Sequence, residues 1–222
     1  MTMSFFPKII VITGIDGSGK TTVSSLLKNE LQKRNKNVKI VQQFAPIFIP
    51  KKILNRFGST LISLERKVSD NTNFAEVKEN KKNPILRNVA ILRIISFGFF
   101  HTLINIAFNV HADIIISDRY FFDTILKVNW IYNKIYDNMF YPLIPKPDLV
   151  VFLDVPPEVG WRREVDGNTT LSQHISKKCV YDEFYNVYKK NNWPILKIDA
   201  LQSKEEILTK ILNRIDGKLS DQ

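Results

Sequence analysis

Five short, mainly apolar runs, separated by longer segments of helical periodicity, restrict this sequence to few folds. The runs cover residues 8–13, 38–41, 113–117, 149–153 and 195–198. Each is too short for a stable helix and is rich in β-branched residues, so each is predicted to be a strand. Strands that are apolar on both faces are typical of parallel sheets covered by helices. The sequence therefore predicts an α/β fold with three layers, a five-stranded parallel sheet with helices on both faces.

The segments between these runs carry apolar residues at helical spacing. Helices are predicted over residues 22–33, 94–110, 121–136 and 203–214. In the first of them, Val23, Leu27 and Leu31 share one face and charged residues lie between them. Residues 67–83 are polar without an apolar period, so they are predicted to form a solvated surface insertion. The length of 222 residues is that of one domain, covering 1–222.

The segment 94–110 carries no charged residue and has the length of a minimal membrane span, about 17 residues. His101, Asn105 and Asn109 follow one another at intervals of four, so they share one helical face. A helix buried in a globular core, with this polar stripe toward a cleft or a partner, accounts for the pattern better than a membrane span. We therefore expect no membrane partner.

The chain is basic, with 32 lysines and arginines against 22 acidic residues and a net charge of +10. This charge predicts attraction to polyanions such as nucleotides, nucleic acids or anionic lipid heads; the alternative is that it serves solubility alone. The single cysteine, Cys179, forms no disulfide within the chain. The sequence does not open with a basic segment followed by a long apolar stretch. We therefore expect no signal peptide and a cytoplasmic location.

One motif carries specific chemistry. The segment GIDGSGKT at residues 14–21 matches the pattern G-x-x-x-x-G-K-[ST], and it lies between a predicted strand and a predicted helix. Its glycines allow a tight turn in which successive backbone N–H groups point at phosphate oxygens. Lys20 supplies a positive charge to the β- and γ-phosphates, and the Thr21 hydroxyl is a ligand for Mg²⁺. The motif predicts a site for a nucleoside triphosphate.

A second motif follows the third predicted strand. Asp118 comes at the carboxyl end of this strand, where an aspartate can hold Mg²⁺ through water. Arg119 can present its guanidinium to phosphate oxygens. The alternative is an exposed ion pair at a strand end. Because ligands of such sheets bind at the carboxyl ends of the strands, we expect both motifs at one site.

With these residues in place, the sequence resembles the thymidylate kinases, a family of nucleoside monophosphate kinases. The segments that carry the resemblance are GIDGSGKTT at 14–22, IISDRY at 115–120, PDLVVFLDVPPEVGWRR at 147–163, Phe184 and Tyr188 in a helix after the lid, and Ile198-Asp199-Ala200 followed by Ser203. Together they cover about half of the chain, in the order found in the family. The resemblance implies a P-loop nucleoside-kinase-like fold, with a lid at about 161–175, and a homodimer.

The resemblance also implies a role for each matching residue. ATP would be the phosphoryl donor and Mg²⁺ the cofactor, with the metal held by Thr21 and Asp118. The residues implied to bind ATP are Gly14, Gly17, Ser18, Gly19, Lys20, Thr21 and Thr22 around the phosphates, and Asp199 and Ala200 at the adenine. Catalysis would rest on positioning and charge alone.

For the acceptor nucleotide, the resemblance implies that Asp16 accepts a hydrogen bond from the 3′-hydroxyl of the sugar. Arg119 would bridge the donor and acceptor phosphates. Arg162 and Arg163, at the base of the lid, would stabilise the charge on the phosphoryl group during transfer.

The acceptor half departs from the family pattern. Where the family has R-E-P after its second strand, this chain has Phe-Ala-Pro at 44–46, without the arginine. The candidates to contact the acceptor phosphate instead are Lys51, Lys52 and Arg56. The A-Y-Q triplet expected after the second motif reads Leu-Lys-Val at 126–128.

Two further departures concern the base and the lid. The family pairs a phenylalanine with an arginine four residues later to read thymine, whereas here Phe97 is followed by His101 and Arg93 lies one turn earlier. These three residues either read the base or merely pack. The family also carries arginine either in the phosphate loop or in the lid, but this chain has Gly17 in the loop and no lysine or arginine in 164–173.

Three functions compete. The first expectation is an ATP- and Mg²⁺-dependent nucleoside monophosphate kinase that converts dTMP to dTDP. The second keeps the scaffold and changes the acceptor to another nucleotide, a nucleoside or a small molecule. The third is a P-loop protein that binds nucleotide for regulation or grips nucleic acid; it is less favoured because the basic residues are spread along the chain rather than gathered in a stripe. We expect ATP and a nucleoside monophosphate as partners and no nucleic acid.

Overall fold

The computed structural model describes residues 8–42, 84–132, 145–164, 169–190 and 192–217. Within these ranges, one five-stranded sheet has the order β2-β3-β1-β4-β5, and every neighbouring pair is parallel. The strands are β1 (Lys8–Thr13), β2 (Val38–Gln42), β3 (Ile114–Asp118), β4 (Leu149–Asp154) and β5 (Ile195–Asp199). The predicted parallel sheet of five strands is confirmed.

The third strand is shifted by one residue from its predicted position. It begins at Ile114 because Asp113 instead contacts the turn before β2, where its carboxylate accepts the backbone N–H of Asn37 at 2.8 Å. At the other end the strand includes Asp118. The carboxylate predicted to hold the metal is therefore the last strand residue, with its backbone fixed by the sheet.

Six helices surround the sheet in the described part of the chain. They are α1 (Lys20–Lys33), α4 (Pro84–Phe108), α5 (Phe121–Tyr132), α6 (Pro157–Arg163), α7 (Leu171–Lys190) and α8 (Lys204–Ile215). Helix α1 starts earlier than predicted because Gly19, with φ 90°, turns the chain directly into the helix. Helix α4 also starts earlier, at a proline, which suits a first helical position. Residues 67–83 and 133–136 lie outside the described residues.

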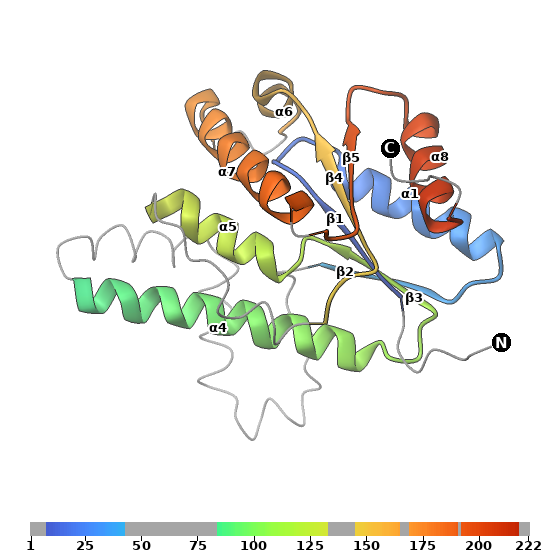
Figure 1. Cartoon of the computed structure of the whole chain (residues 1–222), viewed down its shortest axis with the longest axis horizontal. Coiled ribbons are helices and arrows are strands. Elements are labelled where there is room, and N and C mark those ends of the chain that lie inside the picture. Colours follow the sequence, from blue (N-terminus) through green and yellow to red (C-terminus); the bar gives the residue numbers. More distant parts are fainter. Residues whose placement is uncertain (1–7, 43–83, 133–144, 165–168, 191, 218–222) are drawn as a thin grey trace.

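The helices form a layer on each face of the sheet. Helices α1 and α8 cover one face, and α4, α5 and α7 lie on the other (Figure 1). Helix α6 follows β4 directly at the carboxyl end of the sheet (Figure 1). The three predicted layers are confirmed, and the loops at the carboxyl ends of the strands lie beside α6 and α7.

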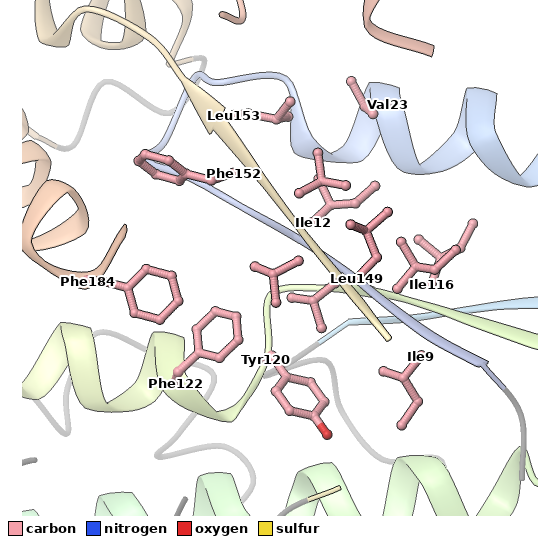
Figure 2. Packing of buried hydrophobic residues seen from close by; sticks show 14 of the residues in the cluster. Ile9, Ile12, Val23, Ile116, Tyr120, Phe122, Leu149, Phe152, Leu153 and Phe184 are labelled. Atoms are coloured by element: carbon pink, nitrogen blue, oxygen red, sulfur yellow. The ribbon is translucent and has the colours of Figure 1, made fainter. Parts of the chain in front are cut away.

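The central strands form the core. Val11, Val150 and Val151 are fully buried, and Ile12 and Phe152 are at most 1% exposed. Figure 2 shows Ile12 and Phe152 in the packed core between the sheet and the helices. Each such side chain contributes about 1.5–3 kcal/mol when buried. This burial holds β1, the strand that leads into the phosphate loop, at the centre of the sheet.

Aromatic packing fixes α7 against α5. Phe122 of α5 packs on Phe184 of α7 with ring centroids 4.6 Å apart, and Phe184 packs on Tyr188 at 4.1 Å. Figure 2 shows Phe122 and Phe184 facing each other between the two helices. The residues one to three turns before Phe184 are therefore held above the carboxyl ends of the strands.

Helix α4 contains the apolar segment and its polar stripe. Ile91, Ile95 and Ile106 are buried, and His101 is 2% exposed. The stripe is bonded within its own helix, since Asn105 Nδ2 lies 2.9 Å from His101 Nδ1. Among the described residues, no helix combines the length and the apolar character needed to cross a membrane.

Candidate active site

Register between β1 and β3 brings the two predicted motifs together. Ile12 pairs with Asp118, and the backbone N–H of Arg119 donates to the Ile12 carbonyl at 3.0 Å. The phosphate loop leaves β1 one residue after this pair, and the Asp118-Arg119 segment leaves β3 beside it. Both motifs therefore lie at one edge of the sheet, the carboxyl ends of its strands, where ligands of such folds bind.

The phosphate loop packs closely against α6. Gly17 has a φ of 76°, in the left-handed region, and a Cβ at this position would lie 2.0 Å from the carbonyl oxygen of Gly160 in α6. Only glycine fits there. The family's loop arginine would occupy this position, so in this chain the contact with α6 excludes it.

Ser18 and Thr22 are the hydroxyl residues predicted to contact ATP. Ser18 is 2% exposed, and its Oγ is buried with no hydrogen-bond partner among the described residues. A buried hydroxyl without a partner is costly, and a phosphate oxygen would satisfy it. Thr22 is exposed in the first turn of α1. The loop therefore offers donors of the kind that a phosphate requires.

The Lys20 side chain bends back over the phosphate loop. Its Nζ donates to the carbonyl oxygens of Gly14 at 3.0 Å and Ile15 at 2.8 Å, and the residue is 7% exposed. Burial and the nearby Arg119 guanidinium lower the pKa of Lys20 to about 8, against the opposing effect of Asp16 and other carboxylates. A cation whose charged form is disfavoured in this way gains most from an anionic ligand.

Thr21 and Asp118 form the predicted metal pair. The Thr21 hydroxyl donates to Asp118 Oδ2 at 3.0 Å. Both groups offer oxygen, the donor that Mg²⁺ prefers. In the described ranges no group of three or more His, Cys, Asp or Glu side chains is arranged to hold a metal. The pair thus fits Mg²⁺ completed by water and phosphate oxygens, as is usual at nucleotide sites.

Asp16 is surrounded by cations. One carboxylate oxygen accepts from Arg119, the other from Lys177 of α7 at 2.7 Å, and Lys20 Nζ lies 4.0 Å away. Burial alone would raise the pKa of Asp16, but these three cations outweigh it and hold the pKa well below its usual range. Asp16 is therefore ionised and acts only as an acceptor, as a contact with a sugar hydroxyl requires.

Arg119 takes an unusual backbone conformation. Its φ is 71°, in the left-handed region, which is uncommon for a residue with a side chain. The Ser117 hydroxyl bonds to the Arg119 carbonyl and helps to hold this turn. Burial opposes its charge, but Tyr181, Asp16 and Asp123 raise the pKa of Arg119 above its ordinary value. Strained residues of this kind cluster at functional sites.

A buried carboxylate, Asp123, ties three elements together beneath this turn. Its Oδ1 accepts the Thr13 hydroxyl at 2.7 Å and the Tyr181 hydroxyl at 2.8 Å, and its Oδ2 accepts the backbone N–H of Tyr120 at 2.8 Å. Burial raises the pKa of Asp123, while Arg119 and these donors act in the opposite direction. The carboxylate joins the end of β1, the start of α5 and α7.

The predicted adenine and lid residues lie near one another. The backbone N–H of Ala200 donates to the Asp154 carbonyl at 2.7 Å, and Asp199 accepts the N–H of Leu201 at 2.9 Å. Arg162 and Arg163 are both exposed on α6, and Arg163 donates to the Ala200 carbonyl at 3.3 Å. Arg163 thus joins the end of α6 to the turn after β5.

The predicted base-reading residues lie along α4. The Phe97 ring is 5.9 Å from the His101 ring, and the helix passes close to α5 at Gly98, where a Cβ would lie 2.5 Å from the Thr124 hydroxyl. Arg93 is also on α4, but its side chain lies outside the described residues. The candidates to contact the acceptor phosphate, Lys51, Lys52 and Arg56, also lie outside the described residues, as do residues 44–46.

Sequence reasoning missed Lys177 and Asp123. Lys177 follows the buried His174 by three residues and precedes Tyr181, Phe184 and Tyr188 at i+4, i+7 and i+11, so it lies on the buried stripe of α7. A lysine on such a stripe is a signal that was available. Asp123 gives no comparable signal, because an acidic residue in the first turn of a helix is ordinary.

We expect Asp123→Ala to destabilise the protein by about 3 kcal/mol or more, because three buried donors lose their acceptor. Tyr181→Phe removes one of these bonds and should cost about 1 kcal/mol. Urea denaturation followed by circular dichroism measures both. Equal losses for the two variants would contradict the role of Asp123 as the shared acceptor.

Comparison with known proteins gives a family for the chain. The sequence model described as "Thymidylate kinase" matches residues 101–211. "Probable thymidylate kinase 1" from Saccharolobus solfataricus is 30% identical over 96% of this chain and 98% of that protein. "Probable thymidylate kinase" from Sulfolobus acidocaldarius is 29% identical over 90% of this chain and 92% of that protein.

Solved structures share the fold. The deoxyadenosine kinase from M. mycoides with bound dATP has a TM-score of 0.59 at 18% identity, covering 94% of this chain and 99% of that one. The same enzyme with dCMP and dCDP gives a TM-score of 0.57 over the same shares. The likeness in sequence extends over nearly the whole chain in the S. solfataricus relative, and the chain belongs to the thymidylate kinase family.

Proposed function

We propose that this protein transfers the γ-phosphoryl group of ATP to the 5′-phosphate of dTMP and forms dTDP. As a member of its family the chain is a nucleoside monophosphate kinase. The observation that carries the proposal is the meeting of two pairs at one sheet edge: Thr21 with Asp118, and Asp16 with Arg119. The first pair suits the donor with its metal, and the second suits an acceptor with a sugar hydroxyl and a phosphate.

In this reaction an oxygen of the acceptor phosphate attacks the γ-phosphorus, and the bond from that phosphorus to the β–γ bridging oxygen breaks. The electron pair of the broken bond leaves with ADP. The loop amides and Lys20 hold the donor phosphates, and Arg119 lies between donor and acceptor. Mg²⁺, held by Thr21 and Asp118, would neutralise charge on the β- and γ-oxygens. Asp16 orients the acceptor through its 3′-hydroxyl.

We further propose one kinase domain over residues 1–222, with a lid at about 161–175, acting as a cytoplasmic homodimer without nucleic-acid or membrane partners. The described elements share one sheet and one core, which supports the single domain. The dimer rests on the family resemblance. A lid that begins beside the phosphate loop is supported by Gly160, whose Cβ would lie 2.9 Å from the Asp16 carbonyl oxygen.

A panel of acceptors, with ADP formation coupled to a spectroscopic readout, tests the substrate. We expect kcat/KM to be highest for dTMP among dTMP, dUMP, dCMP, dAMP, dGMP and the corresponding nucleosides. Turnover with dCMP or dUMP but none with dTMP would show that the change at His101 has altered the preference for the base. Turnover with nucleosides alone would show that the protein is a nucleoside kinase and not a nucleoside monophosphate kinase.

We expect Asp118→Ala to lower kcat by roughly 100-fold or more, because metal geometry matters most in the transition state. The dissociation constant for ATP, measured by calorimetry, should change much less. Asp113→Ala is the matched control, since this carboxylate lies at the opposite end of the same strand region. A loss of ATP affinity as large as the loss of kcat would contradict the assigned role.

The lowered pKa of Lys20 predicts a pH dependence. Its folded pKa is about 8, so the charged form is lost as pH rises through that value. We expect kcat/KM for MgATP to fall about tenfold per pH unit above pH 8. Bound phosphates stabilise the ammonium, so kcat at saturating ATP should fall only at higher pH.

Lys20→Arg is the control for this titration, because arginine keeps its charge throughout the range. Its activity should be lower but independent of pH up to about 10. A wild-type profile that stays flat to that pH, or an equal decline in the arginine variant, would exclude Lys20 as the titrating group.

A further inference from the structure

Lys177 is placed at the site by a helix that follows the lid. It lies in α7, with its side chain 16% exposed, and its Nζ is 2.7 Å from Asp16 Oδ2. The other oxygen of Asp16 is bonded to Arg119. Two cations from different elements thus share one carboxylate of the phosphate loop, and Lys20 lies within 4.0 Å of the same group.

Several other contacts also hold α7 in place. The Tyr181 hydroxyl bonds to Asp123, and Phe184 packs on Phe122. The next residue along, Lys178, pairs with Asp154 of β4 at 2.8 Å and with Asp182 of its own helix. Since α7 is anchored by these contacts, the partly buried Lys177 beside Asp16 points to a role other than anchoring the helix.

The chain also lacks a basic residue at the two places where its family carries an additional arginine, position 17 of the loop and residues 164–173. Gly17 excludes a side chain from the loop, since a Cβ would lie 2.0 Å from the Gly160 carbonyl oxygen. Arg163 is directed to the Ala200 carbonyl at 3.3 Å. After Arg163, the next lysine or arginine in the sequence is Lys177. Lys177 is therefore the first cation after the lid, and α7 places it beside the phosphate loop.

We infer that Lys177 is a catalytic residue whose ammonium contacts the phosphoryl group during transfer. This inference rests on the proposed function. As the acceptor oxygen bonds to the γ-phosphorus and the bond to the bridging oxygen breaks, negative charge spreads over the three oxygens of that group. Lys177 stabilises this charge together with Lys20 and Arg119, and no proton leaves it. Asp16 holds the ammonium in position until the substrates bind.

The test compares Lys177→Met with Lys178→Met. The two lysines are adjacent in one helix, and both side chains are 16% exposed, but Lys178 bonds to Asp154 and Asp182 instead of Asp16. We expect Lys177→Met to lower kcat about 100-fold or more, with an ATP dissociation constant within a few-fold of wild type. Lys178→Met should keep kcat within about threefold. Thermal melting confirms that each variant is folded, and Lys177→Arg should recover part of kcat.

A kcat of Lys177→Met within about threefold of wild type overturns the inference. An increase confined to the KM of the acceptor also overturns it, because Lys177 would then only orient Asp16. An equal loss in Lys178→Met overturns it as well, since the effect would arise from the helix.

Failure of the proposed function gives a different result. In that case the wild-type protein itself phosphorylates no nucleoside monophosphate in the acceptor panel. Lys177 is then tested by adding aluminium fluoride, a mimic of the transferring group, to the protein with ADP and Mg²⁺. Tighter ADP binding in wild type and Lys178→Met but not in Lys177→Met supports the inference, and equal tightening in all three overturns it.

Discussion

Parallel pairing of β1 with β3 is the constraint on which the site depends. The register that sets Ile12 against Asp118 places the phosphate loop beside the Asp118-Arg119 turn. The Thr21 hydroxyl then lies 3.0 Å from Asp118, although the two residues are far apart in the sequence. A slip of one residue would turn Asp118 to the opposite face of the sheet, because side chains alternate along a strand. The backbone N–H of Arg119, which donates to the Ile12 carbonyl at 3.0 Å, continues this pairing beyond the end of β3.

The parts of the molecule that sequence predicts well are those set by local patterns. A short apolar run such as 149–153 buries all of its side chains only as a strand covered on both faces, and β4 is such a strand. The glycine pattern at 14–21 fixes a backbone turn whose partner is a phosphate, so it indicates chemistry as well as conformation. The order of strand, loop and helix follows from these two signals together. Even there, the inclusion of Asp118 in β3 depends on its pairing with Ile12 of β1 and Gln42 of β2, which is tertiary.

The parts that sequence does not predict are those that a distant element supplies. Lys177 reaches Asp16 only because aromatic packing sets the position of α7, and no spacing along the chain contains that distance. Asp123 is one of many acidic residues at helix starts until Thr13 and Tyr181 are seen to converge on it. Gly17 is similar, since its close approach to Gly160 decides that no arginine can stand there. Such contacts become visible only once the fold has brought separate elements together.

Asp16 links these contacts to the proposed catalysis. In the free protein its carboxylate offsets the mutual repulsion of Lys20, Arg119 and Lys177, which explains how three cations can share a largely buried site. In the proposed mechanism the 3′-hydroxyl of the acceptor donates a hydrogen bond to this carboxylate. The three cations then bond to phosphate oxygens instead of Asp16. Each phosphate group therefore binds to cations that are no longer paired with Asp16. The two substrates should therefore strengthen each other's binding, and the cations are held near their working positions before either substrate arrives.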